Sequence, residues 1–279
     1  KLIEDLTHMA EIRAKNQLLK NLKGIHLWHA PMSSCSQRVR LVLAETKTIY
    51  ESHVINIAKD EHATKSYQAI HPNGLVPAII IDGRLFIESI DIIELLPDNG
   101  SDLLLHRDIS LLKKADQAQM DLKLLSFEFL FKGGPQQIQE QFDKFQVTHK
   151  NEQLKQFRID LSNGFGRERI EEAVARTHDH FQKLEDILSD GRQFLGGAVY
   201  SLSDVAWIPN FHRCNLMDWP FENTPYLTDW FNRVSERESF KIALLSWENK
   251  DVMKSLENYT SQGKVLGRDV RAFGTLTNF

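Results

Sequence analysis

The sequence contains little cysteine. Only Cys35 and Cys214 occur among its 279 residues, and two cysteines cannot form a disulfide framework. No group of cysteine and histidine at zinc-binding spacing accompanies them, so we expect no metal. This cysteine usage favours a reducing, cytoplasmic setting. No apolar run approaches the roughly 20 residues that a membrane helix needs, and we expect no membrane span.

The sequence also lacks an excess of positive charge. The formal net charge is −4, which gives no general support for a surface that tracks phosphates, so we expect no nucleic-acid partner. What is present is ordinary for a globular protein: 42% hydrophobic and 26% charged residues. The length allows one large domain or two small ones.

The pattern of apolar residues changes along the chain. In residues 1–23 apolar residues recur every three or four positions, which predicts an amphipathic N-terminal helix, either packed on the body or serving as a partner-binding arm. Residues 24–98 alternate short strand-like runs with helices, as in an α/β domain. Residues 102–259 contain helical patterns only, among them continuous ones over 109–132 and 240–258. Residues 260–279 form a basic, less patterned tail. The predicted architecture is therefore an α/β domain followed by an all-α domain.

A turn rich in hydroxyl groups joins the first predicted strand, 25–28, to a helix. It contains Ser33, Ser34 and Cys35. The N-terminus of a helix presents free N–H groups and the positive end of the helix dipole, so an anion placed there is stabilised. A thiolate is such an anion, and it can belong either to Cys35 or to a bound thiol.

Two further pairs of residues stand at the ends of predicted strands. Val76-Pro77 precedes a hairpin whose strands, 78–81 and 84–87, flank Asp82-Gly83. A cis Pro77 would leave the Val76 backbone free to pair with an extended peptide, whereas a trans proline would be an ordinary loop residue. Glu88-Ser89 lies between strand and helix, where it can hold a carboxylate and an ammonium group or simply cap the helix.

Taken together, these motifs resemble the thioredoxin-fold half of a glutathione S-transferase. The run from Ser33 to Arg40 is similar to the zeta-class signature, and the same run with the long C-terminal half resembles the tetrachlorohydroquinone-dehalogenase-like class. Ser201-Leu202-Ser203-Asp204 matches the family's helix-capping box. The resemblance implies the glutathione S-transferase fold, with an α/β thioredoxin-like domain before an all-helical domain.

The resemblance implies that glutathione is the co-substrate and assigns residues to its parts. Val76 would pair with the cysteinyl backbone beside a cis Pro77. Glu88 and Ser89 would hold the γ-glutamyl ammonium and carboxylate. His62 would contact the glycine carboxylate, the alternative being a solvated loop histidine.

Ser33 is the first candidate for holding the glutathione sulfur as a thiolate, and Ser34 is the substitute after a shift of one residue. Cys35 has two interpretations: it attacks a glutathionyl product to form a mixed disulfide, as a reductive dehalogenase requires, or it is inert. Arg38 or Arg40 can add positive field or contact an acidic substrate, although a solvated or interface arginine is the commoner case.

The second substrate is expected between the domains, beside Met32, Phe127, Phe131 and Trp207. It would be a hydrophobic or aromatic small-molecule electrophile, consumed by conjugation or dehalogenation. A zeta-like cis–trans isomerase and a non-catalytic glutathione-transferase-like interaction module are the alternatives. The resemblance also suggests a homodimer.

Overall fold

The computed structural model describes residues 11–14, 16–96, 102–103, 106–134 and 138–274. These residues belong to two compact units that interleave in sequence. The first unit comprises residues 1–101, 137–162 and 242–247, and the second comprises residues 102–136, 163–241 and 248–279. Most residues of the predicted α/β domain lie in the first unit, and most residues of the predicted helical domain lie in the second. Two segments of the predicted helical domain, 137–162 and 242–247, belong to the first unit instead.

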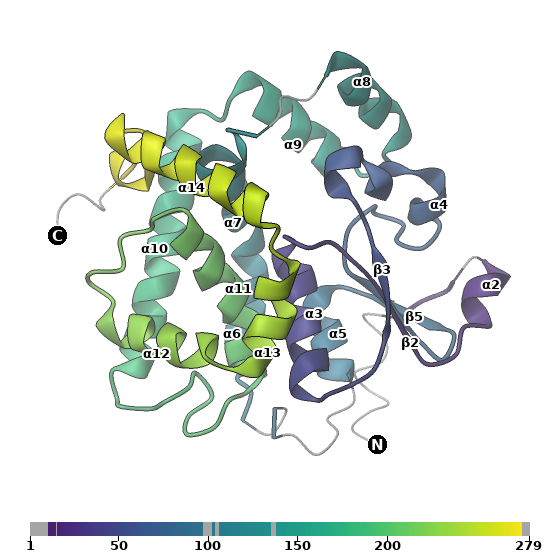
Figure 1. The fold of residues 1–279 in the computed structure, drawn as a ribbon, viewed down its shortest axis with the longest axis horizontal. Helices are drawn as coiled ribbons and strands as arrows, with labels where there is room; N and C mark the ends of the chain where they lie inside the picture. The colour runs from purple at the N-terminus through teal and green to yellow at the C-terminus, as the bar shows by residue number, and fades with distance from the viewer. Residues whose placement is uncertain (1–10, 15, 97–101, 104–105, 135–137, 275–279) are drawn as a thin grey trace. The chain divides into compact units, whose positions relative to one another are not determined.

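The first unit is a five-stranded sheet with helices on both faces (Figure 1). The sheet order is β1-β5-β4-β2-β3, and only the β2–β3 pair is parallel. Its elements are β1 (Glu11–Ile12), α2 (Gln17–Lys20), β2 (Ile25–His29), α3 (Ser34–Glu45), β3 (Glu51–Val54), η1 (Ile57–Lys59), η2 (Glu61–Ala63), α4 (Lys65–Gln68), β4 (Ala78–Ile81), β5 (Arg84–Ile87), α5 (Ser89–Leu95), α8 (Gln139–Thr148), α9 (Glu152–Asn163) and η4 (Leu245–Trp247). The predicted hairpin is confirmed to the residue.

Alternation along the strands creates two apolar faces. One face buries Trp28 of β2 against Leu19 of α2 and Tyr67 of α4. Leu27, which points the other way, is fully buried on the face where α3 and α5 pack (Figure 1).

The N-terminal prediction is partly wrong. Residues 1–10 lie outside the described residues, but residues 11–23 do not form one amphipathic helix. Glu11 and Ile12 pair antiparallel with Phe86 and Leu85 and so extend the sheet by a strand, and only 17–20 are helical.

The second unit is built around the long buried helix α11 (Leu202–Leu216). All thirteen residues from Leu202 to Cys214 are buried, as expected for a helix surrounded by others. The other elements of this unit are α6 (Ile109–Gln117), α7 (Gln119–Ser126), the π-helical turn η3 (Phe127–Phe131), α10 (Arg167–Leu188), α12 (Pro225–Ser235), α13 (Glu238–Ala243), α14 (Lys250–Val265) and η5 (Val270–Ala272). The last two residues of α13 belong to the first unit. No strand beyond β5 is present in the described residues, which agrees with the all-helical prediction.

Two predicted helices are interrupted. The pattern over 109–132 becomes α6, α7 and the π-helical turn, and the pattern over 240–258 becomes α13, η4 and α14. Asn249 caps the start of α14 by accepting hydrogen bonds from the Asp251 and Val252 amides, which fixes where that helix begins.

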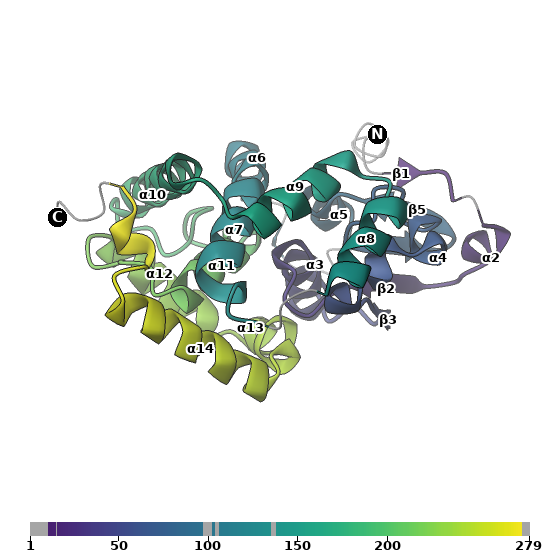
Figure 2. The same cartoon turned by 90° about the horizontal axis from the view of Figure 1, so that it is seen from above.

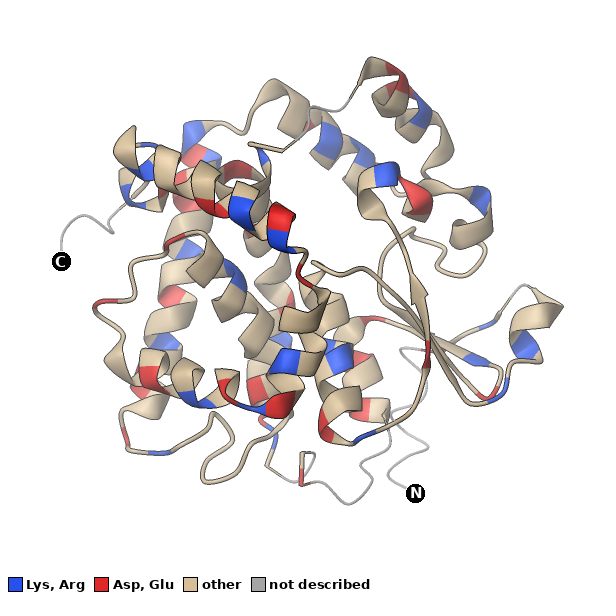
Figure 3. Ribbon diagram, in the orientation of Figure 1, with Lys and Arg blue, Asp and Glu red and all other residues tan. Residues whose placement is uncertain are grey.

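Charge is mixed along the helices. Both α10 and α14 carry basic and acidic side chains (Figure 3). Among the described residues, no helix is at once long and apolar enough to cross a membrane.

The inserted helices α8 and α9 are held to the rest of the first unit by half-buried polar contacts, and α8 lies beside α4 (Figure 2). Arg158 of α9 donates two hydrogen bonds to the carboxylate of Asp60, and Gln141 of α8 donates a third. Gln68 of α4 donates to the Thr148 carbonyl and accepts from the Lys150 amide. The insertion is therefore part of the α/β unit.

Gly74 lies in close contact with His149 of the inserted segment, and replacing Gly74 tests this contact. A Cβ atom there would lie 2.5 Å from Nε2 of His149, and its φ of +57° already disfavours other residues. We expect Gly74→Ala to lower the free energy of unfolding by about 3 kcal/mol, measured by urea denaturation.

Gly24→Ala is the matched control for Gly74→Ala. Its φ of +75° carries the same backbone cost, but nothing lies within 4 Å of the added Cβ, so a loss of about 1 kcal/mol is expected. Equal losses of unfolding free energy in the two variants would mean that the close contact between Gly74 and the insertion does not contribute to stability.

Asp204 organises the second unit, and its removal should be costly. The buried carboxylate accepts hydrogen bonds from the Leu195 and Ser201 amides, the Ser201 hydroxyl and the Trp230 indole. Asp204→Ala leaves these buried donors without an acceptor. We therefore expect the free energy of unfolding, measured by urea denaturation, to fall by about 3 to 5 kcal/mol. Asp229 is exposed, and Asp229→Ala is a control expected to change the free energy of unfolding by less than about 0.5 kcal/mol. An equally large loss in Asp229→Ala would mean that the hydrogen bonds of Asp204 do not account for the effect.

Candidate functional site

Three candidate segments converge at one end of the sheet because of strand register. Trp28 near the end of β2 pairs with Ala78 at the start of β4, and Ala78 pairs with Ile87 at the end of β5. The segments that follow β2, precede β4 and follow β5 therefore leave the sheet at the same end. These segments carry Ser33, Val76 and Glu88.

Ser33 is the N-cap of α3. Its Oγ accepts a hydrogen bond of 3.2 Å from the Ser36 amide, so the hydroxyl hydrogen remains available to donate. Met32, Ser33, Ser34 and Cys35 are all half-buried. The opening of the helix thus presents a hydroxyl donor at the positive end of the α3 dipole, and the two together favour a bound anion.

The Val76–Pro77 peptide bond is cis, as the resemblance implied. Among the described residues, no hydrogen bond of the Val76 main chain is present. Its N–H and C=O are the kind of groups with which an extended peptide pairs as an added strand.

Glu88 and Ser89 occupy a strained turn. Glu88 has φ +68° and ψ 111°, a conformation that costs a non-glycine residue about 1 to 3 kcal/mol and that clusters at ligand sites. Glu88 is exposed and Ser89 is buried. Nη1 of Arg38 donates to the Ser89 hydroxyl at 3.2 Å, which places a cation behind the group predicted to hold a carboxylate.

His62 is covered by the insertion. Its imidazole is only 8% exposed and contacts the rings of Phe145 and His149, with centroid separations of 5.7 and 5.6 Å. The solvated-loop alternative is therefore wrong. The role of His62 toward a glycine carboxylate stays a prediction, and α8 bounds the space from which that group would arrive.

Arg38 and Arg40 are not solvated. They are 0% and 1% exposed, which corrects the expectation of a solvated position. Arg40 donates to the carbonyls of Ala30, Pro31 and Ala243 and to Nδ1 of His29. Burial lowers the pKa of Arg40 to about 10, still well above neutral pH, so the guanidinium stays charged.

His29 completes this buried group as a neutral ring. Burial, the neighbouring Arg40 charge and the field of His53 lower its pKa to about 3. Because Nδ1 accepts from Arg40, Nε2 carries the hydrogen and donates to the Ser52 hydroxyl at 2.8 Å.

The aromatic candidates belong to the second unit. Phe127 and Phe131 lie on the π-helical turn, where their rings meet edge to face at 5.5 Å and are half-exposed. Trp207 is 1% exposed, and its indole N–H donates to the Leu111 carbonyl. In the described structure Trp207 is therefore a core residue.

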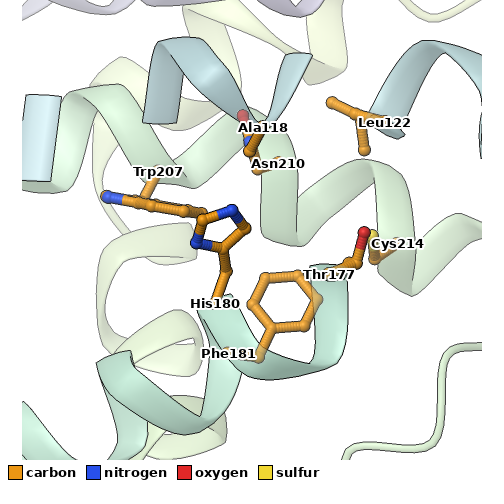
Figure 4. A pocket seen from close by; sticks show the side chains of 8 residues that line it. All are labelled: Ala118, Leu122, Thr177, His180, Phe181, Trp207, Asn210 and Cys214. Carbon is orange, nitrogen blue, oxygen red and sulfur yellow. The ribbon is translucent and has the colours of Figure 1, made fainter. Parts of the chain in front are cut away.

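The space beside Trp207 is small. Residues lining it include His180, Asn210 and Cys214 (Figure 4). The cavity measures about 10 Å³, which suits one water molecule and excludes an aromatic ligand. Burial raises the pKa of the Cys214 thiol far above its usual range, so this cysteine is unreactive.

Sequence reasoning missed the contribution of residues 242–247. Ala243 and Trp247 both contact Arg40, yet they were expected within a continuous helix of the other domain. The burial of Arg40 did have a signal: Val39, Leu41, Val42 and Leu43 are apolar on more than one helix face, as in a helix that is buried all round.

Comparison with known proteins gives the same picture for both units. The model of the glutathione S-transferase N-terminal domain matches residues 32–99, and that of the C-terminal domain matches residues 167–233. A protein named glutathione S-transferase TCHQD from Arabidopsis thaliana is 25% identical over 240 residues, covering 78% of this chain and 88% of its own. Mouse maleylacetoacetate isomerase is 29% identical over 200 residues, covering 70% and 80%.

Solved structures share the fold. The β-etherase LigF from Sphingobium sp. strain SYK-6 superposes with a TM-score of 0.69 at 21% identity, covering 78% of this chain and 98% of its own. A zeta-class maleyl pyruvate isomerase superposes with a TM-score of 0.57 at 17% identity, covering 81% and 99%. With both domain models matched in order and the site motifs in place, the chain belongs to the glutathione S-transferase family.

Proposed function

We propose that this protein is an enzyme that binds glutathione in the first unit and uses its thiolate to attack a hydrophobic or aromatic electrophile. The observation that carries the proposal is the convergence of Ser33, Val76 and Glu88 at one end of the sheet. Val76 offers main-chain pairing to the cysteinyl residue, and Ser89 with Glu88 faces the γ-glutamyl group. Ser33 is left to meet the sulfur.

The chemistry of the step follows from the groups at the turn. The Ser33 hydroxyl donates its hydrogen to the sulfur while its oxygen accepts from the Ser36 amide. Stabilising the anion lowers the pKa of the bound thiol and keeps the nucleophile charged near neutral pH. The thiolate then forms a C–S bond, and the leaving group departs with its electron pair.

The half-buried Cys35 favours a second candidate, reductive dehalogenation. Here the Cys35 thiolate attacks the sulfur of a glutathionyl adduct, the C–S bond breaks, and the released carbon takes a proton. The resulting mixed disulfide is reduced by a second glutathione, which yields oxidised glutathione. In a zeta-like isomerase the thiolate adds to the substrate, the former double bond rotates, and the C–S bond breaks to release the thiolate again. This sequence uses Ser33 alone, and similarity to maleylacetoacetate isomerases favours it.

We propose that the enzyme works as a homodimer in the cytoplasm. Reduced glutathione is supplied in reducing compartments, and family membership favours a dimer. Equilibrium sedimentation at micromolar concentration checks the oligomeric state.

Glutathione binding is the first test. Calorimetric titration should give a Kd of millimolar or tighter, and Ser89→Ala should weaken binding by about tenfold because a carboxylate loses a buried hydrogen bond. Ser235 is half-buried in α12 of the second unit, and Ser235→Ala is a control expected to bind like the wild type. No binding by the wild type would contradict the enzyme proposal and leave the interaction-module alternative.

The second test separates the two sulfurs. With a panel of halogenated aromatic electrophiles, Ser33→Ala should lower kcat/KM by about a hundredfold if the thiolate belongs to glutathione. Ser33→Thr keeps both the hydroxyl and the helix cap, so activity should largely return. Conjugate, halide and oxidised glutathione are measured together.

Cys35→Ser gives the opposite pattern. For conjugation or isomerisation its rate should stay within about twofold of the wild type, because the serine keeps the polarity of the turn. Loss of oxidised glutathione in Cys35→Ser, with conjugate accumulating and halide still released, would instead identify reductive dehalogenation.

A further inference from the structure

We propose that Arg40 is a positioning residue for thiolate formation: its buried guanidinium fixes the turn that carries Ser33 and supplies a permanent positive charge behind it. This inference rests on the proposed binding of glutathione. It also assigns a role to residues 242–247, which hold the guanidinium from the other side.

The first observation is the hydrogen bonding between Arg40 and the turn. Long helical side chains run back toward the helix N-terminus, and Nη2 of Arg40 reaches the Pro31 carbonyl at 2.8 Å. Nη1 reaches the Ala30 carbonyl at 3.1 Å, and the same carbonyl accepts from the Ser33 amide at 3.2 Å. A single carbonyl oxygen therefore links the guanidinium to the residue expected to hold the sulfur.

The second observation is that no carboxylate compensates the charge. The polar partners of Arg40 are carbonyls of Ala30, Pro31 and Ala243 and the neutral His29 ring. Among the described residues, no Asp or Glu forms an ion pair with it. A buried cation with neutral partners favours an anion nearby, because the low-dielectric surroundings screen it poorly.

Other titratable groups facing Arg40 do not cancel this charge. His29 of β2 is neutral. Tyr50 lies in the connection before β3; burial raises the pKa of its hydroxyl, and the Arg40 charge lowers that pKa by a smaller amount. Residues 242–247 contain no titratable side chain. A bound thiolate would be the anion that completes the site.

Trp247 covers the guanidinium and allows a test that leaves Arg40 intact. The Arg40 guanidinium lies 5.1 Å from the centre of the Trp247 ring, which also meets His29 edge to face at 4.6 Å. Trp247 is partly exposed, so polar replacements are tolerated better than at a core position. Trp247→Glu places a carboxylate beside Arg40, and Trp247→Gln has nearly the same shape without the charge.

The experiment measures the pKa of glutathione's thiol in the bound state by ultraviolet absorbance of the thiolate across pH. Trp247→Glu should raise this pKa by about one, a tenfold change in the ionisation constant, whereas Trp247→Gln should match the wild type. Arg40→Met should raise it by at least as much, and Arg40→Lys should restore most of the effect. S-methylglutathione, which has no thiol to ionise, should bind all folded variants alike.

The outcomes are distinct. An unchanged thiol pKa in Trp247→Glu, with glutathione bound, would overturn the role of Arg40 and leave the proposed function standing. Equal shifts in Trp247→Glu and Trp247→Gln would mean that packing, not charge, acts on the thiol, which also overturns it. Failure of the wild type to bind either ligand would overturn the proposed function itself. If Arg40→Met does not fold, the two Trp247 variants decide.

Discussion

The buried guanidinium of Arg40 is the constraint around which the first unit is arranged. Removing a cation from water costs several kcal/mol, and charged hydrogen bonds return about 1.5 to 3 kcal/mol each. Four such bonds reach the end of β2, the turn before α3 and the segment near residue 243. Because each partner is a fixed acceptor, the three segments are held in one geometry. Arg40, two helical turns further along α3, thereby fixes the position of the turn that carries Ser33.

A second polar anchor, Asp60, holds the inserted helices in the same manner. Its carboxylate accepts from Arg158 and Gln141, and the Arg158 guanidinium also stacks 3.6 Å above the Phe145 ring. The insertion covers His62 as a consequence. The end of the site predicted to receive the glycine carboxylate is therefore bounded by residues that are distant in sequence.

Local rules predicted the parts of the fold that depend on local interactions. Asp82-Gly83 between two largely apolar runs specified the hairpin, and Ser201 with Asp204 specified the start of α11, because turn and cap geometry are set within a few residues. The interruption near residue 244 was not predicted. Its apolar pattern continues the helix, whereas the Ala243 carbonyl accepts a hydrogen bond from Arg40, which is distant in sequence. The burial of Arg40 was also missed, although its apolar neighbours in α3 indicate a helix that is buried all round.

The candidate site divides in the same way. Ser33, Val76 and Ser89 could be identified from motifs, because each sits at a strand or helix terminus whose geometry local sequence determines. The difference between Ser33 and Cys35 comes from hydrogen-bond direction. Ser33 uses its oxygen as the cap and keeps a hydrogen to donate outward, so it can only stabilise another group's anion. Cys35 can itself become the anion. A turn with one helix N-terminus and one fixed cation favours a single negative charge, because two adjacent thiolates repel each other. In the proposed dehalogenation the chemistry of Cys35 comes after the first C–S bond has formed, because the sulfur that Cys35 attacks belongs to the glutathionyl adduct.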